Sequence, residues 1–253
     1  MTALAALLFV SGAVTGSFVG VVAHRVPRKE SIVAPRSRCP HCGGQIAAYD
    51  NIPIVSWLLL RGRCRSCGKS ISARYPVVEL TLAALFAGTY LILDDDPAEM
   101  ALGLAFVTML AAVTLTDLER RVIPNAVLIV GAVAAIAIAA PTDPDSLPER
   151  AIAAAAAGGF LLLAALAYPG GMGMGDVKLG AVMGLYLGRA VAPALLTGFA
   201  AGALVGLALV LRHGAAARKR AVPFGPFLAL GGVVGLWAGD EIIDWYLDAF
   251  FRD

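Results

Sequence analysis

Long apolar runs alternate with short polar stretches along almost the whole chain. Each run is too long and too uniformly hydrophobic for a half-buried strand, and about 20 apolar residues suffice for a helix to cross a bilayer. Because a backbone in lipid must satisfy its own hydrogen bonds, the runs predict helices. Eight spans are expected, at residues 3–23, 76–93, 100–116, 122–140, 151–168, 176–188, 190–211 and 222–239. The sixth is short and begins in a glycine-rich stretch.

The composition agrees with a membrane protein. Hydrophobic residues make up 59% of the 253 residues and charged residues only 15%, well below the roughly 25% of soluble proteins. An apolar chain with a net charge of only +2 is neither a soluble globule nor disordered. We predict an all-α polytopic membrane protein with a first span at residues 1–23, an insertion domain at 24–75 and the remaining spans within 76–253.

The basic residues indicate an orientation. Of the 20 lysines and arginines, 17 fall on one side of the predicted spans, in connections 24–75, 117–121 and 212–221 and at Lys178. Such residues mark the cytoplasmic side. We therefore predict a multi-pass protein of the inner (cytoplasmic) membrane, with domain 24–75 in the cytoplasm and both termini outside. Without interleaved aromatic residues, the basic residues do not indicate nucleic-acid binding.

The first apolar run has an alternative interpretation as a secretory signal peptide. A signal peptide begins with basic residues and ends in a cleavage site. No basic residue precedes His24, and the positive charge follows the run instead. The run is therefore predicted to be a spanning helix.

All four cysteines lie in the insertion domain, in two CxxC pairs separated by 21 residues: Cys39, Cys42, Cys64 and Cys67. Two such pairs can place four thiolates around one ion, which predicts a closed tetrahedral zinc site with a structural role. Cytoplasmic thiols stay reduced, so disulfides are not expected. The alternative is four unliganded cysteines. His41, between two of the ligands, is interpreted as a bystander.

Two aspartates lie at predicted span ends, where ionisable groups are costly and often functional. Asp117 ends the third span and Asp176 opens the sixth, within the Gly173-Met174-Gly175-Asp176 sequence. Both are predicted at the cytoplasmic edge, at similar depth, where they can meet if the two spans pack together. Two adjoining carboxylates can share a proton and activate a water, as in aspartic proteases. The alternatives are a solvated helix end for Asp117 and a helix N-cap for Asp176.

Two further ionisable residues are candidates for substrate binding. Lys178 follows Asp176 by two positions, and can either tune the aspartates or extend to the membrane interface. Glu79, in the second span, is either a buried hydrogen-bonded group or a member of the site.

The chain resembles the type IV prepilin peptidases, membrane aspartic proteases of the GxGD kind. The resemblance covers nearly the whole chain and includes both CxxC pairs. Its remaining motifs are Gly16-Ser17-Phe18, His24-Arg25-Val26-Pro27, Tyr49-Asp50-Asn51-Ile52-Pro53, Leu60-Arg61-Gly62-Arg63-Cys64, Arg74-Tyr75-Pro76 with Glu79, the stretch 117–125, Gly173-Met174-Gly175-Asp176-Val177-Lys178 and Phe224-Gly225-Pro226-Phe227.

The resemblance implies that Asp117 and Asp176 are the catalytic pair of a peptidase domain at 76–253. It implies prepilin or pseudopilin substrates with short basic leaders, cut after a glycine at the cytoplasmic membrane edge. Many members also methylate the new N-terminus with S-adenosylmethionine. The chain has no glycine-rich nucleotide loop to predict this independently. If methylation occurs, the insertion domain and Glu79 are its expected location.

Two other classes of function compete with the peptidase. A proton-coupled transporter also uses paired aspartates, but it places them near the bilayer midplane and between repeated halves. A zinc-stabilised scaffold of a secretion machine would carry out no chemistry, and would tolerate the loss of either aspartate.

Overall fold

The computed structural model describes residues 2–168, 170–214 and 222–251. Most of these residues are helical, and none of them belongs to a β-strand, although two isolated bridges pair extended backbone. The chain divides into two compact units, Met1–Asp94 and Asp95–Asp253. The all-α architecture predicted from the sequence is confirmed.

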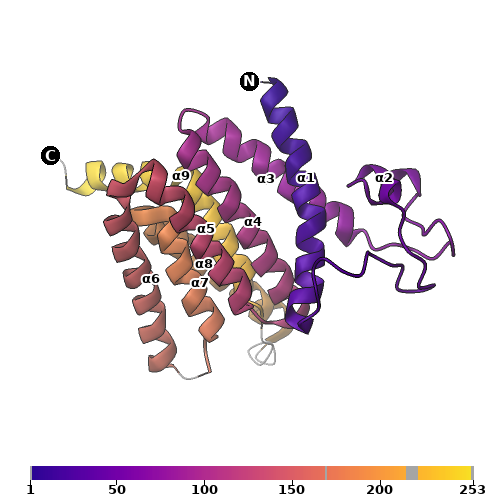
Figure 1. Cartoon of the computed structure of the whole chain (residues 1–253). Helices are drawn as coiled ribbons and strands as arrows, with labels where there is room; N and C mark the ends of the chain where they lie inside the picture. Colours follow the sequence, from indigo (N-terminus) through magenta and orange to yellow (C-terminus); the bar gives the residue numbers. More distant parts are fainter. Residues whose placement is uncertain (1, 169, 215–221, 252–253) are drawn as a thin grey trace. The chain divides into compact units, whose positions relative to one another are not determined.

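Unit 1 consists of two long helices joined by an insertion with little regular structure. Its helices are α1 (Thr2–Arg25), η1 (Val26–Arg28), η2 (Ala48–Asn51), α2 (Val55–Leu59) and α3 (Arg74–Leu93). α1 packs along α3 (Figure 1), and glycines bring the two backbones together. A Cβ at Gly12 would lie 2.6 Å from the Leu82 carbonyl oxygen. Small residues of this kind are typical of contacts between membrane helices.

Unit 2 is a helical bundle. Its elements are α4 (Pro97–Arg120), α5 (Asn125–Thr142), η3 (Pro144–Ser146), α6 (Leu147–Ala167), α7 (Met174–Leu187), η4 (Gly188–Ala190), α8 (Val191–His213) and α9 (Gly225–Phe250). Helix ends follow local signals: Asp96 accepts hydrogen bonds from the first N–H groups of α4, and Arg121, with φ of +54°, ends that helix. α4 ends and α7 and α9 begin at the same end of the bundle (Figure 1).

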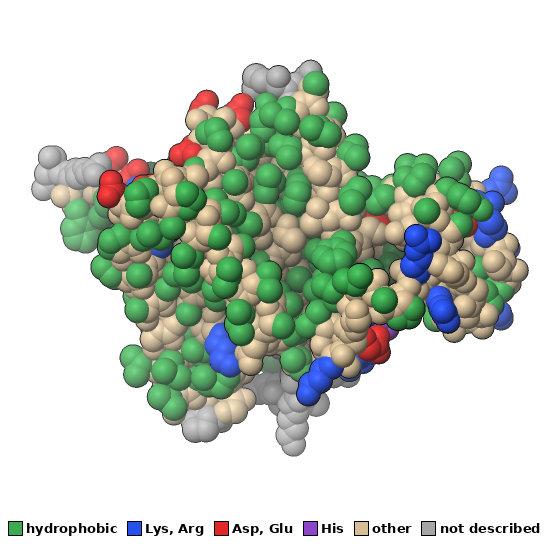
Figure 2. Space-filling view, viewed as in Figure 1, with side chains coloured by type: hydrophobic (Ala, Val, Ile, Leu, Met, Phe, Trp, Pro, Cys, Tyr) green, Lys and Arg blue, Asp and Glu red, His purple; other side chains and the backbone are tan. Residues whose placement is uncertain are grey.

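Large apolar side chains fill the interior of unit 2. Five side chains from four different helices are almost completely buried: Phe106, Leu110, Leu161, Met183 and Leu228. Many other large hydrophobic side chains face outward, and Figure 2 shows hydrophobic side chains over much of the visible face of the helices. Apolar side chains on both inner and outer faces are expected of helices that are surrounded by lipid.

Seven helical stretches among the described residues are long and apolar enough to cross a membrane. One of them, Met174–His213, contains both the sixth and the seventh of the eight predicted spans. The stretch is nevertheless two helices, because η4 separates α7 from α8 and Gly188 in that turn has φ of +52°. The eight predicted spans therefore correspond to seven continuous stretches, because the turn between α7 and α8 is too short to divide the sixth span from the seventh.

The last helix is longer than its apolar run. The predicted span ended at residue 239, where acidic residues begin, but α9 continues to Phe250. Polar residues interrupt a hydrophobic run, but they do not interrupt the backbone hydrogen bonds of a helix. Hydropathy therefore predicts the end of the apolar segment and not the end of the helix.

Close packing of α8 on α9 gives a first prediction. A Cβ at Gly231 of α9 would lie 2.1 Å from the Ala194 carbonyl oxygen of α8, so Gly231→Ala forces these two helices apart. We expect Gly231→Ala to lower the free energy of unfolding by about 1–3 kcal/mol, as overpacking does. Thermal unfolding of the purified protein in lipid measures this loss.

Gly206 of α8 provides the matched control, because a Cβ there meets no atom within 4 Å. Alanine is favoured over glycine in helices by up to about 1 kcal/mol, so Gly206→Ala should be neutral or stabilising. Equal melting temperatures for the two variants would show that the contact between α8 and α9 does not require glycine.

Candidate functional site

Asp117 lies in the last turn of α4, and its side chain is turned into unit 2. Only 6% of it is exposed, so the interpretation as a solvated helix end does not hold. Its Oδ2 accepts a hydrogen bond of 2.9 Å from the backbone N–H of Gly225, the first residue of α9. The N–H groups of a first helical turn have no partner within the helix, and their partial positive charge stabilises a carboxylate.

Gly225 leaves room for this contact. A Cβ at that position would lie 2.8 Å from Oδ2 of Asp117, closer than real Cβ atoms approach other atoms. Pro226 follows and has no N–H, and proline is well suited to the start of a helix. The Gly-Pro pair therefore supplies one accessible donor to Asp117.

Asp176 is the third residue of α7, and only 9% of it is exposed. Its Oδ2 accepts a hydrogen bond of 3.2 Å from the N–H of Gly173, which is the N-cap residue. Asp176 is therefore not the N-cap itself, the alternative considered from the sequence. It occupies the position from which an acidic side chain reaches back to the start of its own helix.

The ends of α4 and α7 that carry the two aspartates lie together within unit 2. A Cβ at Gly175 would lie 3.0 Å from Cβ of Ile123, in the connection that follows α4. The charge of Asp117 acts electrostatically on Asp176. The structure thus brings both carboxylates into one buried site, each on the N–H group at a helix N-terminus.

The two candidates for substrate binding lie elsewhere. Lys178 donates a hydrogen bond of 3.0 Å from Nζ to Oδ1 of Asn125, at the start of α5. Two positions along a helix correspond to about 200°, so Lys178 and Asp176 face nearly opposite directions. Glu79 lies in unit 1, is 7% exposed, and accepts a hydrogen bond of 2.7 Å from the N–H of Ile54. Glu79 is thus a buried, hydrogen-bonded group, and it also belongs to the lining of a groove in unit 1.

The four cysteine thiols of the insertion converge on one point. The sulfur atoms of Cys39, Cys42, Cys64 and Cys67 all lie within 4.8 Å of one another, and those of Cys39 and Cys67 are 3.9 Å apart. Four thiolates bound to zinc at 2.3 Å in a tetrahedron are separated by about 3.8 Å. The cluster therefore fits a tetrahedral thiolate metal site, and His41 is not part of it.

Each CxxC pair lies in the same kind of turn. In the first, Arg38 bridges Gln45 and Gly43 follows the second cysteine with φ of +69°. In the second, Arg63 bridges Ser70, and the corresponding glycine has the same φ. The two turns are thus one backbone motif repeated after 25 positions, in which an arginine, two cysteines and a glycine recur at corresponding positions of residues 38–43 and 63–68.

The thiols differ in how readily they lose a proton. The backbone N–H groups of Cys42 and His41 lower the pKa of Cys39 to about 6. The backbone N–H of Lys69 favours the Cys67 thiolate, but desolvation and the neighbouring sulfur atoms outweigh it and raise the pKa of Cys67 to about 11. A bound cation would remove the mutual repulsion of the thiolates that keeps Cys67 protonated.

Unit 1 also contains a groove of about 550 Å³ between α1, α3 and the insertion. Its lining includes the carboxylates of Glu30 and Glu79 and the aromatic rings of Trp57 and Tyr75. Trp57 is held in place by a hydrogen bond of 3.2 Å from Nε1 to the Ile71 carbonyl. The lining also includes the basic side chains of Arg25, Arg38, Arg65 and Lys69, so the groove offers both charges and aromatic rings, and its volume is that of a small-molecule site.

Comparison with known proteins identifies the family. Residues 10–93 match the bacterial peptidase A24 N-terminal domain, and residues 104–211 match the type IV leader peptidase family. A Bacillus subtilis (strain 168) protein named prepilin leader peptidase/N-methyltransferase is 39% identical over 246 residues, covering 95% of this chain and 97% of the relative. The chain belongs to the type IV leader peptidase family.

Other relatives of this leader peptidase carry the same name. The protein of Aeromonas hydrophila is 35% identical, with 96% of this chain and 94% of the relative covered. The protein of Myxococcus xanthus (strain DK1622) is 40% identical, with 84% of this chain but 65% of the relative covered. No solved structure matches the chain. The family resemblance drawn from the sequence is confirmed, and the chain is a multi-pass membrane peptidase.

An ion pair in the insertion gives a second prediction. Arg65 donates to Asp50 at 2.7 Å, and this hydrogen bond holds the pKa of Asp50 below its usual range. A depressed pKa stabilises the fold above the unfolded value of about 3.9 and the contribution is lost as the pH falls through the folded value. We expect Arg65→Gln to raise the pKa of Asp50 toward 3.9, so that acid protonates the carboxyl at higher pH.

Carboxyl chemical shifts of Asp50, followed by NMR during acid titration, measure this shift. Arg63→Gln is the matched control, because Arg63 is an exposed arginine of the same turn and contributes its backbone to the bridge with Ser70. An unchanged titration of Asp50 in Arg65→Gln would mean that the ion pair does not persist in solution.

Proposed function

We propose that this leader peptidase removes the leader from prepilins or pseudopilins with Asp117 and Asp176 as its catalytic pair. The observation that carries the proposal is the meeting of two buried carboxylates, from distant parts of the sequence, at one end of unit 2. The names of the relatives, prepilin leader peptidase/N-methyltransferase, supply the substrate class.

The chemistry follows from two carboxylates that hold one proton between them. The ionised carboxylate takes a proton from water as the water oxygen bonds to the scissile carbonyl carbon. The protonated one gives its proton to the carbonyl oxygen, forming a tetrahedral intermediate. The C–N bond then breaks as the leaving nitrogen takes the proton that the first carboxylate received from water. The second carboxylate regains a proton from a hydroxyl group of the intermediate, and the leader is released with a new carboxyl group. Backbone N–H groups of Gly225 and Gly173 hold the two side chains in orientation.

The position of the pair suits a substrate that lies partly in the bilayer. Both aspartates are at ends of candidate spans, where a peptide emerging from the membrane would cross the interface. The charge asymmetry of the connections supports the cytoplasmic side of the inner membrane for this edge and for the insertion, with both termini outside. A basic leader would then remain in the cytoplasm while the apolar start of the mature pilin stays in lipid.

A second activity, methylation of the new N-terminus, is supported by the relatives' shared name. S-adenosylmethionine, which carries a sulfonium charge and an adenine ring, would supply the methyl group. The groove of unit 1 is the candidate binding site, because Glu30 and Glu79 offer negative charge and Trp57 and Tyr75 offer rings for stacking.

The cysteine cluster is proposed to hold a structural zinc ion. Four thiolates leave no open coordination position, so the ion would not take part in peptide hydrolysis. The insertion has little regular structure, and the ion would hold its two turns together.

The third prediction concerns the catalytic pair. Each of Asp117→Asn and Asp176→Asn should abolish cleavage of a prepilin precursor by the full-length protein in lipid, because an amide neither accepts nor gives up a catalytic proton. Mass spectrometry of the products measures cleavage, and with S-adenosylmethionine present the mature product of the wild type should gain one methyl group. Neither variant should yield a methylated product, because no new N-terminus forms.

Asp240→Asn is the control, because Asp240 is an exposed acidic residue of α9 that pairs with Arg189. Cleavage that survives either Asp117→Asn or Asp176→Asn would remove that aspartate from catalysis. No cleavage of any precursor by folded wild type would instead favour a scaffold or a proton-coupled transporter.

The fourth prediction concerns the metal. Elemental analysis should find one zinc per chain, and Cys42→Ser or Cys67→Ser should remove most of it. Zinc binding must displace the proton of Cys67, whose pKa is raised to about 11, so affinity should fall as the pH falls. His41→Ala should retain the ion. A loss of zinc in His41→Ala equal to that in the cysteine variants would contradict a ligand set of four thiolates.

A further inference from the structure

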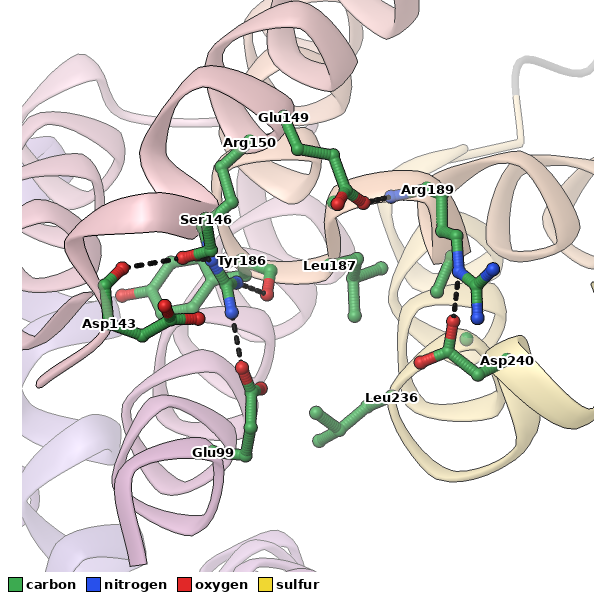
Figure 3. Close-up of a pocket in the computed structure, with 13 residues that line it drawn as sticks. Glu99, Asp143, Ser146, Glu149, Arg150, Tyr186, Leu187, Arg189, Leu236 and Asp240 are labelled. Carbon is green, nitrogen blue, oxygen red and sulfur yellow. Dashed lines mark hydrogen bonds and ion pairs between the residues drawn. The ribbon is translucent and has the colours of Figure 1, made fainter. Parts of the chain in front are cut away.

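A charged cavity of about 350 Å³ lies in unit 2 where α7 ends and α4 and α6 begin (Figure 3). Two ion pairs lie in its lining, Arg150 with Glu99 and Arg189 with Asp240. The charged groups that line it are Glu99, Asp143, Glu149, Arg150, Arg189 and Asp240. The catalytic mechanism proposed above uses none of them. Arg150 differs from the other charged groups because its side chain is only 8% exposed.

The Arg150 guanidinium connects three helices. From α6, its Nη1 donates to the carbonyl oxygens of Tyr186 and Leu185 in the last turn of α7. Its Nη2 donates to Oε1 of Glu99 in the first turn of α4. Its Nε donates at 3.0 Å to Oγ of Ser146, which holds the guanidinium plane in one orientation. The planar guanidinium has five N–H donors in a fixed fork and here serves four acceptors, whereas a lysine ammonium has three donors on one atom.

The end of α7 needs such a partner. With 14 residues, α7 is about 21 Å long, shorter than the roughly 30 Å hydrocarbon layer. The last four carbonyls of a helix have no partner within it, and in an apolar layer each unsatisfied group costs several kcal/mol. The Arg150 charge satisfies two of these carbonyls and complements the negative end of the helix dipole.

The helices that Arg150 joins are the two that carry the aspartates. Glu99 stands at the start of α4, whose other end carries Asp117. Tyr186 stands at the end of α7, whose first turn carries Asp176. Because a helix is stiff along its axis, fixing the far ends of α4 and α7 also fixes how far each extends at the catalytic end.

Further contacts at the same end of α7 hold its rotation. The Tyr186 hydroxyl donates a hydrogen bond of 2.7 Å to the Gly131 carbonyl of α5, and its ring stacks on Phe106 of α4 with centroids 4.9 Å apart. The following turn rests on α6, where Glu149 accepts a hydrogen bond of 3.0 Å from the Arg189 backbone N–H. Glu149 and Arg150, adjacent in sequence, thus hold the turn and the helix end together.

We propose that Arg150 is a positioning residue for the catalytic pair: it sets the axial position of α7 against α4, and thereby the spacing between Asp176 and Asp117. The inference rests on the proposed function. It assigns to this cavity a mechanical role at a distance of about 15 Å along α7 from Asp176, the length of ten helical residues.

The fifth prediction follows. Arg150→Gln should lower kcat for a prepilin precursor about 100-fold, the loss that a displacement of about 1 Å at a catalytic group can cause. KM should stay within about twofold, because a positioning residue acts on the spacing of the catalytic groups and not on substrate binding. Arg150→Lys keeps the charge but loses the fork, and should lose only about 10-fold in kcat.

The pH profile of kcat separates positioning from folding. Two interacting carboxylates titrate as a pair, and their spacing sets how far apart their two apparent pKa values lie. A displaced α7 therefore changes the width or centre of the profile. A smaller folded fraction would lower the amplitude and leave the shape unchanged.

Arg189→Gln is the matched control. Arg189 lines the same cavity and pairs with Asp240 of α9 at 2.7 Å, but its side chain is 52% exposed and joins neither α4 nor the α7 carbonyls. The Arg189→Gln variant should retain the wild-type kcat and pH profile. Tyr186→Phe removes the hydrogen bond to Gly131 and gives a second test at the same end of α7. It should lower kcat less than Arg150→Gln does, and should also change the pH profile.

Wild-type kcat and an unchanged pH profile in both Arg150→Gln and Tyr186→Phe would overturn the inference. If Arg150→Gln fails to fold, an altered profile in folded Tyr186→Phe supports it, and an unaltered one overturns it. Asp117→Asn and Asp176→Asn, measured in the same experiment, distinguish a failure of the proposed function from a failure of the inference about Arg150. If they are inactive while the Arg150 variants match wild type, only the inference fails, whereas cleavage by either aspartate variant refutes the proposed function first.

Discussion

Helix ends in an apolar environment must find hydrogen-bond partners, and this requirement determines where the structure buries charge. The buried ionisable side chains of Glu79, Asp117, Arg150 and Asp176 each bond to a backbone group. Three of them satisfy a helix end in unit 2. The fourth, Glu79, accepts the N–H of Ile54, which precedes the short helix α2 in unit 1. A buried charge and an unpaired backbone group are each costly alone, and here they offset one another.

The same requirement suits the carboxylates to catalysis. Asp117 and Asp176 are removed from water, yet each has an oxygen on a backbone N–H that cannot rotate away. Fixed dipoles of this kind hold a group in its reactive orientation without solvent reorganisation. Gly225 and Gly173 contribute through their backbones alone, so the proposed catalytic end of unit 2 requires two positions without side chains as well as the two aspartates.

The sequence predicted what depends on local pattern. Apolar runs located the long helices, CxxC spacing located the thiol cluster, and the motifs around Asp117 and Asp176 indicated the family. It did not predict the partners of these groups, because Gly225 lies 108 positions from Asp117 and Arg150 lies 51 positions from Glu99. It also did not show that Lys178 faces Asn125, because that depends on the rotation of α7 within the bundle.

The helix boundaries show a second limit of what the sequence predicts. The predicted span began at residue 151, which left Arg150 in the preceding connection, but the helix α6 begins at Leu147 and carries Arg150 as a buried side chain. The reason lies in the short α7. The α7 helix begins at the proposed catalytic end and has only 14 residues, so it is shorter than the hydrocarbon layer, and its last carbonyls accept hydrogen bonds from the buried Arg150. The depth of Asp176 at one end of α7 and the burial of Arg150 at the other are consequences of the same helix length.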